Sequence, residues 1–103
     1  MHVISRKAFN DASKKYPNDA LALDSLYRVL NSGKFASSLE LKKVIPSLDN
    51  FKYKTDWWVI DVGGNNLRLL AFITFRNGTV MVKHIVPHAE YDKLTNRYRK
   101  NEI

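Results

Sequence analysis

Three side chains in the second half of the chain can bind a phosphate or move a proton: Arg68, His88 and Tyr91. His88 follows an apolar stretch and is expected to begin a helix, where free backbone N–H groups and partial positive charge favour a bound phosphate. Tyr91 lies three residues later and would share the helical face of His88. Plainer interpretations are that His88 is only a polar helix start and that Tyr91 belongs to the core.

Arg68 interrupts an apolar run between Leu67 and Leu69, and it is expected on the opposite face of a strand from those leucines. An arginine at such a position needs a partner or a cleft. It can pair with an acidic residue such as Asp61, or its planar guanidinium can hold a phosphate through two hydrogen bonds. The residues alone leave both interpretations open.

The chemistry that suits these residue types is the cleavage of RNA. The 2′-hydroxyl of the substrate is the nucleophile, so the protein has to supply a proton acceptor, a proton donor and positive charge for the developing phosphorane. Histidine, tyrosine, lysine and arginine are sufficient for this. We therefore expect a site without a metal or another cofactor, provided that Arg68, His88 and Tyr91 meet in one pocket.

Further basic and aromatic residues are candidates for contact with nucleic acid. Lys42 is expected at the end of a helix, Lys52 precedes Tyr53, and Lys93 lies in the C-terminal segment. Tyr53 could stack on a base. Lysines near a helix end often only complement the helix dipole, so these positions are weaker candidates than the first three.

Other catalytic signatures are missing from the sequence. Gly63-Gly64 lacks the Gly-Lys-Ser/Thr continuation of a phosphate-binding P-loop. His2, His84 and His88 do not have the spacing of metal ligands, and no serine lies in a nucleophile elbow. The chain has no cysteine, which excludes thiolate chemistry and disulfides. Metal-dependent and serine hydrolases are therefore poor candidates.

The charge of the chain favours a polyanionic partner such as nucleic acid, because 17 Lys and Arg against 10 Asp and Glu give a net charge of +7. With 103 residues, of which 45% are hydrophobic, residues 1–103 are expected to form a single domain with its own core. The N-terminal MHVISRKAF predicts neither a signal peptide nor a membrane span. Together with the lack of cysteine, this favours a cytoplasmic protein.

Helical spacing of apolar residues dominates the first half of the chain. Three helices are expected there, after a short edge strand at residues 1–4. In order, they extend from an N-cap at Ser5 to Pro17, from a cap at Asn18 or Asp19 to Gly33, and from a capping box at residues 37–40 to Pro46.

In the second half, alternation with a period of two predicts strands at residues 57–62, 67–75 and 79–86. Asn77-Gly78 predicts a type I′ hairpin turn between the last two strands, since both residues tolerate a positive φ. Helical spacing resumes at His88. This order predicts an α+β fold in which N-terminal helices pack on a small, mostly antiparallel sheet and a C-terminal helix follows.

Three segments resemble signatures of the HigB-type toxins, which belong to the RelE/ParE-like group of type II toxin–antitoxin systems. Residues 62–68 resemble the GGN-x-x-R motif of these toxins, and residues 87–92 resemble their T-H-x-x-Y-D motif, with Pro87 in place of the threonine. Residues 41–53 are similar to the stretch that precedes the sheet in enterobacterial members. The three segments lie in register over essentially the whole chain.

The resemblance implies a compact RelE-like fold and a ribosome-dependent endoribonuclease, an mRNA interferase that cleaves translated mRNA and so inhibits translation. It also implies a HigA-type helix-turn-helix antitoxin as the partner. The toxin would then contact DNA only indirectly, through this antitoxin. By position, Arg68 would stabilise the transition state, and His88 and Tyr91 would share proton transfer or orientation. Phosphate binding would fall to Lys42, Lys52 and Lys93.

Two alternatives from other functional classes are considered. A toxin of the same fold can act on DNA gyrase, as the ParE relatives do, and it would need no catalytic residues. A non-catalytic RNA-binding module would lose binding in proportion to activity when Arg68 or His88 is replaced. The combination of His88 and Tyr91 with the lysines favours the nuclease.

Overall fold

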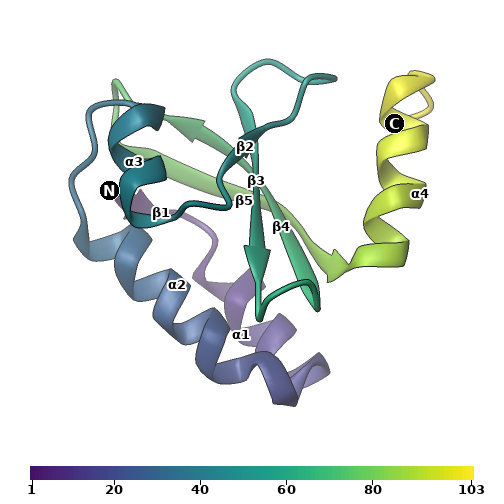
Figure 1. The fold of residues 1–103 in the computed structure, drawn as a ribbon, viewed down its shortest axis with the longest axis horizontal. Helices are drawn as coiled ribbons and strands as arrows, with labels where there is room; N and C mark the ends of the chain where they lie inside the picture. The colour runs from purple at the N-terminus through teal and green to yellow at the C-terminus, as the bar shows by residue number, and fades with distance from the viewer.

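A five-stranded sheet forms the centre of the molecule (Figure 1). In the computed structural model, which describes residues 1–103, the strands lie in the order β1-β5-β4-β3-β2. β1 runs parallel to β5, and every other neighbouring pair is antiparallel. The strands are β1 (His2–Val3), β2 (Asp49–Asn50), β3 (Trp57–Val62), β4 (Leu67–Thr74) and β5 (Thr79–Pro87).

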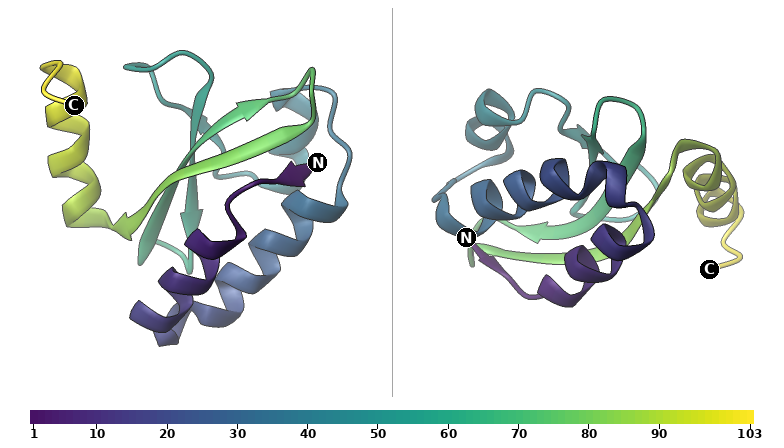
Figure 2. Two further views of the ribbon diagram at one scale, coloured as in Figure 1. Left: turned by 180° about the vertical axis from the view of Figure 1, so that it is seen from behind. Right: turned by 90° about the horizontal axis from the view of Figure 1, so that it is seen from below.

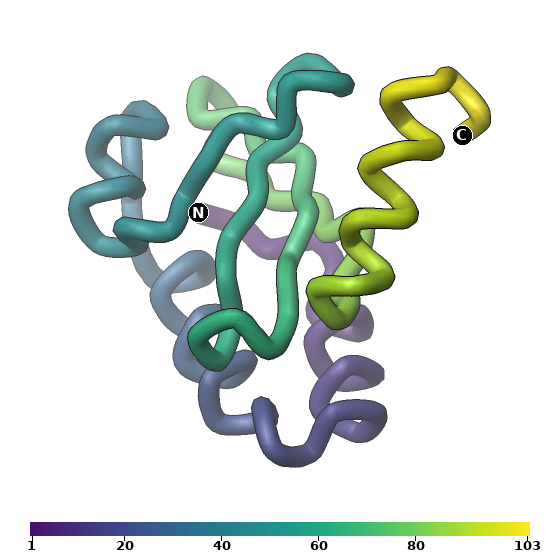
Figure 3. Tube along the Cα trace, turned by 45° about the vertical axis from the view of Figure 1, so that its right-hand side comes forward, coloured from purple at the N-terminus to yellow at the C-terminus, as the bar shows by residue number.

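The helices cover the two faces of this sheet separately, which confirms the predicted α+β fold. The first two form an antiparallel hairpin beside one face, whereas the last follows β5 and stands well apart from them (Figures 2 and 3). None of the helices is long and apolar enough to cross a membrane. They are α1 (Arg6–Lys15), α2 (Ala20–Ser32), α3 (Ser38–Val44) and α4 (His88–Arg99), with a 3-10 turn, η1 (Pro17–Asp19), before α2.

Alternating side chains of β4 enter two different hydrophobic clusters, because successive residues of a strand point to opposite faces. Leu69 and Ala71 are fully buried in the main core, which α1 and α2 close. Leu70 is buried in a second, smaller cluster that includes Tyr98 of α4. Arg68 shares the face of Leu70, opposite Leu67 and Leu69 as expected.

A β-bulge in β5 changes which residues face α4. Leu70 pairs with His84 but Ala71 pairs with Val82, so Lys83 is an extra residue in the ladder. The predicted alternation over residues 79–86 is therefore interrupted at Lys83. One inserted residue moves all later side chains to the other face, so His84 lies across from Leu70 on the face of the second cluster. The end of β5 thus directs α4 to the face of Arg68.

The prediction of a type I′ turn at Asn77-Gly78 is wrong. Thr74 pairs with Thr79, so the loop has four residues rather than two. Gly78 alone adopts a positive φ, +68°, and its N–H donates to the Thr74 carbonyl at 2.8 Å. A four-residue loop is usually built around a type I turn and needs a left-handed residue only at its end, which explains why Asn77 does not adopt a positive φ.

Tertiary contacts replace two of the three predicted helix caps. The Ser5 hydroxyl accepts a hydrogen bond from the Val82 N–H at 3.2 Å and does not cap α1. Asp19 precedes α2 but is buried, and its carboxylate accepts from the Asn66 amide at 3.0 Å instead. Ser37 does cap α3, since its hydroxyl accepts from the Glu40 N–H at 3.3 Å.

The turn between β3 and β4 connects the sheet to the start of α2. Gly63 and Gly64 adopt φ values of +61° and +71°. A Cβ on Gly63 would collide with the carboxylate of the buried Asp19, whereas a Cβ on Gly64 would meet nothing within 4 Å. The two glycines therefore share a backbone conformation but differ in their surroundings.

This difference predicts the effect of two matched substitutions. Gly64→Ala is expected to lower the free energy of unfolding by about 1–2 kcal/mol, the cost of a left-handed alanine. Gly63→Ala is expected to lower it further, because the new methyl group also displaces Asp19 from Asn66. Urea unfolding of both variants measures the two values, and equal losses would contradict the close approach of Asp19.

Candidate active site

Arg68 lies near the start of β4, on the sheet face that α4 covers. Its cross-strand neighbour is Asp61, and Arg68 Nε is 3.3 Å from Asp61 Oδ1. The side chains are 25% and 32% exposed, so water screens this ion pair less than one on the open surface. The pairing with Asp61 that the sequence left open is therefore present, but it engages only one edge of the guanidinium.

The other edge of the guanidinium reaches His88, the first residue of α4. Arg68 Nη2 lies 2.9 Å from His88 Nε2. An arginine can only donate, so this contact is a hydrogen bond when Nε2 carries no proton. The other ring nitrogen, Nδ1, faces Asp92 Oδ2 at 3.5 Å. His88 is thus held between a donor and a carboxylate, one at each nitrogen.

Tyr91 forms the third side of the cluster. The guanidinium carbon of Arg68 lies 4.9 Å from the centroid of the Tyr91 ring, within the range of a cation–π interaction. The ring also meets Phe51 edge-on, with centroids 6.4 Å apart. The structure therefore brings Arg68, His88 and Tyr91 together, although a hairpin separates the first from the other two. We name these three residues the Arg68 cluster.

The N-terminus of α4 opens beside this cluster. The helix begins at His88, and Pro87 at the N-cap position makes no side-chain hydrogen bond to the first turn. Pro87 has no hydroxyl with which to occupy the first amides. The free N–H groups and the helix dipole favour an anion at this point.

A groove leads from the cluster along the space between α4 and the segment that follows β2. It has a volume of about 490 Å³, and Tyr91 and Thr95 form its α4 side. Lys52 and Tyr53 lie on the opposite side, with the Lys52 ammonium 5.3 Å from the Tyr53 ring centroid. Of the three central residues, Tyr91 alone lines the groove, and the opposite side carries the carboxylate of Asp49 as well as the ammonium of Lys52.

Two of the predicted phosphate-binding lysines lie outside this arrangement. The ammonium of Lys42 donates to the Leu48 carbonyl at 2.7 Å and supports the chain after α3. Lys93 is exposed on α4, two residues after Tyr91. At 3.6 residues per turn, this spacing places Lys93 on nearly the opposite side of the helix from Tyr91. Of the four candidate RNA-binding residues, only Lys52 and Tyr53 border the groove.

An aromatic cluster beneath the site holds α4 on the sheet. The Tyr98 ring packs edge-on against Phe51 and Trp57, with centroids 5.6 and 5.3 Å apart. The Tyr98 hydroxyl is 2.8 Å from His84 Nε2. Burial lowers the pKa of His84, an effect that Glu90 partly opposes and Lys83 reinforces. Burial also raises the pKa of Tyr98, partly offset by Arg97, so both partners favour their neutral forms.

The acidic and imidazole groups of the molecule do not form a metal centre. No group of three or more His, Asp or Glu side chains lies close enough together to hold a metal ion. Around the cluster, the carboxylates of Asp61 and Asp92 are separated by the guanidinium and the imidazole that they contact. These side chains therefore hold one another through the guanidinium and the imidazole.

Comparison with known families identifies the kind of protein that carries this site. A sequence profile described as "HigB_toxin, RelE-like toxic component of a toxin-antitoxin system" matches residues 19–94. The chain belongs to the HigB toxin family. The matched range contains Arg68, His88 and Tyr91, and the α+β architecture agrees with a RelE-like fold. Membership of a toxin–antitoxin family also implies an antitoxin as a partner.

Curated relatives cover nearly the whole chain. The "mRNA interferase HigB" of Escherichia coli O6:H1 strain CFT073 is 56% identical over 102 residues, which are 99% of each chain. The "mRNA interferase toxin HigB" of Escherichia coli strain K12 is 40% identical over 99 residues, 96% of this chain and 95% of the relative. The "mRNA interferase HigB" of Shigella flexneri has the same identity and coverage.

Two parts of this HigB-family site were not assigned from the sequence. Asp92 lies in the segment of residues 87–92, and its spacing of four residues from His88 predicts a contact on the same helical face. The aromatic support of α4 is the other part. Phe51 and Tyr98 are distant in sequence, and no local pattern indicates that their rings meet.

The buried His84 predicts a pH dependence of stability. Its pKa is lowered in the folded protein, so the unfolded chain binds a proton more readily, and stability is lost as the pH falls below the ordinary value of 6.5. His84→Gln can still bond to Tyr98 but cannot be protonated. It is expected to lose less stability than the wild type between about pH 7.5 and about pH 5.5.

Thermal unfolding across this pH range measures the difference, with His2→Gln as a control because His2 is exposed. Parallel losses of stability in the wild type and in His84→Gln would show that protonation of His84 is not responsible.

Proposed function

We propose that this HigB-family toxin is an endoribonuclease that cleaves mRNA by acid–base chemistry at the Arg68 cluster. The observation that carries the proposal is the 2.9 Å contact between Arg68 Nη2 and His88 Nε2, made against the ring of Tyr91. A guanidinium, an imidazole and a phenol thus lie together beside a free helix N-terminus. The relatives named mRNA interferases support the same activity.

Arg68 is the group assigned to the phosphate. Its Nε is buried and has no hydrogen-bond partner, since the approach to Asp61 is close enough for an ion pair but poorly aligned for a hydrogen bond. A buried donor without a partner is costly, and a phosphate oxygen would satisfy it. The guanidinium would stabilise the additional negative charge that the phosphorane carries in the transition state.

His88 is the group assigned to proton acceptance. When a phosphate draws the guanidinium away, Nε2 is free to take the proton of the 2′-hydroxyl. The O2′–P bond forms, the P–O5′ bond breaks, and the leaving O5′ takes a proton, for which Tyr91 is the nearest phenol. Asp92 beside Nδ1 would stabilise the imidazolium that His88 becomes. The products are a 2′,3′-cyclic phosphate and a 5′-hydroxyl.

RNA would lie in the groove that ends at Tyr91. Lys52 would meet a phosphate and Tyr53 would stack on a base, a proposal supported by their position in the wall opposite α4. Lys42 and Lys93 would contribute through the general field of a chain with a net charge of +7 rather than through the groove.

The setting that we propose is translated mRNA on the ribosome, and hence the cytoplasm, with a HigA-type helix-turn-helix antitoxin as the partner. This part rests on the family, together with the basic character of the chain. A toxin that acts on DNA gyrase would not need the Arg68 cluster. Inhibition of DNA supercoiling by the pure protein would nevertheless favour that class of toxin.

Replacement of the two central residues tests the assignment. His88→Ala is expected to reduce mRNA cleavage by about 10²–10⁴-fold, the usual contribution of a general base. Arg68→Ala is expected to reduce it by about 10²–10³-fold through lost charge stabilisation. Both variants should still bind RNA, because the groove remains.

The measurements are cleavage in a translation extract, growth arrest on expression and melting temperature. Lys14→Ala is the matched control, because Lys14 is exposed on α1. Full toxicity of both folded variants would refute the site, and RNA binding lost in parallel with cleavage would indicate a binding module.

The ends of the RNA products test the mechanism separately. Attack by the 2′-hydroxyl leaves a 2′,3′-cyclic phosphate or a 3′-phosphate, and an mRNA with a 2′-deoxyribose at the cleaved position should resist the toxin. Mass spectrometry of the fragments distinguishes these ends. A 3′-hydroxyl end, or efficient cleavage at the deoxyribose, would mean that water is the nucleophile and that His88 does not activate the ribose.

A further inference from the structure

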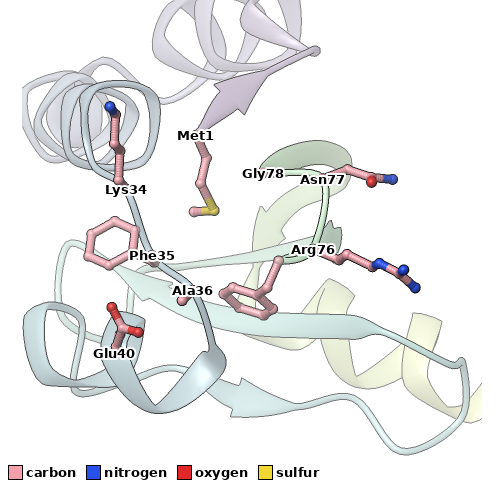
Figure 4. Close-up of a pocket in the computed structure, with 9 residues that line it drawn as sticks. Met1, Lys34, Phe35, Ala36, Glu40, Arg76, Asn77 and Gly78 are labelled. Atoms are coloured by element: carbon pink, nitrogen blue, oxygen red, sulfur yellow. The ribbon is translucent and has the colours of Figure 1, made fainter.

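A hollow separate from the groove at Tyr91 lies at the tip of the β4–β5 hairpin (Figure 4). It has a volume of about 370 Å³. Residues 34–36, between α2 and α3, form one wall, residues 75–78 of the hairpin form another, and Met1 and Glu40 complete it. We name it the hairpin-tip hollow.

The lining of the hairpin-tip hollow is apolar where it meets the core. Met1, Phe35 and Phe75 are partly buried and pack against the main core, and each also borders the hollow. Helix α3, which contributes Glu40 to the lining, also carries two exposed apolar residues, Leu39 and Val44, which are 75% and 53% exposed. Apolar side chains gathered around a hollow indicate contact with another protein more than scattered ones do.

The rim of the hollow is basic. Lys34 and Arg76 are exposed and form no ion pair, and Glu40 is the single acidic residue of the lining. Another hollow, of about 380 Å³, shares Phe75, Arg76 and Asn77 with the first and is also lined by Asp56 and residues 73–74. Arg76 therefore borders both hollows.

The hairpin-tip hollow cannot belong to the Arg68 cluster. Arg68 lies near the start of β4 and Phe75 directly after its end. At roughly 3.3 Å per residue, the two are roughly 20 Å apart along the strand. A ligand in the hollow would leave Arg68, His88 and Tyr91 uncovered.

We propose that the hairpin-tip hollow is a docking site for the antitoxin, occupied by a segment that carries a bulky apolar side chain next to acidic ones. The apolar side chain would contact Phe35 and Phe75, and the acidic ones would pair with Lys34 and Arg76. This inference rests on family membership, which implies an antitoxin, and does not depend on the nuclease proposal.

Other occupants fit the hollow less well. An RNA backbone would find cations at the rim but an apolar floor, on which a phosphate would lose its water without gaining a partner. A second copy of the chain would bring one basic rim against another, and the two would repel each other. An acidic segment with an apolar anchor matches both the floor and the rim.

Two substitutions at the hollow test the proposal. Ala36→Trp fills it from an exposed position, and Arg76→Glu reverses the charge at its rim. Each is expected to weaken binding of the antitoxin, purified separately from its complex with this chain, by at least about tenfold. Leu21→Trp and Lys14→Glu are matched controls, because Leu21 is 84% exposed on α2 and Lys14 is exposed on α1, both outside the hollow.

Calorimetric titration gives the dissociation constants, and mRNA cleavage by the free variants is measured in parallel. Cleavage should be unchanged, and the melting temperature of each free variant shows that it is folded. Wild-type affinity of a folded Arg76→Glu or Ala36→Trp would overturn the proposal. So would reduced cleavage with intact antitoxin binding, which would assign the hollow to the ribosome or to RNA. If the wild-type chain cleaves no RNA but the variants still bind the antitoxin more weakly, the docking proposal would be supported and the nuclease proposal refuted.

Discussion

The packing of α4 against the aromatic side of the sheet is the contact on which the Arg68 cluster depends. Tyr98 lies against Phe51 and Trp57 and is bonded to His84, while the N-terminal end of the same helix carries His88 and Tyr91. A shift of this helix would move an imidazole and a phenol together, away from a guanidinium that is fixed on β4. For the acid–base chemistry that we propose, which is sensitive to displacements of about 1 Å, the buried aromatic contacts matter because they position His88 and Tyr91.

The β-bulge at Lys83 makes that packing possible. Before the bulge, Val80 and Val82 pack with the main core; after it, His84 lies on the face of the second cluster. Without the extra residue, the end of β5 would present the opposite set of side chains to each face. The bulge is thus a local irregularity of the backbone with a consequence for the site, as is common for bulges near functional residues.

The two ends of β4 differ in chemical character. The end near Arg68 is polar and charged, and a guanidinium, an imidazole and two carboxylates contact one another there. The end at the hairpin tip is apolar at its floor, with Phe75 against the core and unpaired cations at its rim. A single strand therefore separates a polar, charged cluster from a hollow with an apolar floor.

The order of the helices and strands, the face on which Arg68 lies and the start of α4 at His88 follow from the sequence alone, because they reflect periodicity and local backbone preference. The type I′ turn at Asn77-Gly78 and the cap by Asp19 do not hold, since strand pairing and a distant partner, Asn66, outweigh local preference. The sequence does not predict which face of the sheet α4 covers or that Arg68 contacts His88. Both depend on the β-bulge in β5 and on packing between aromatic rings that are distant in the sequence, so only the tertiary structure could decide them.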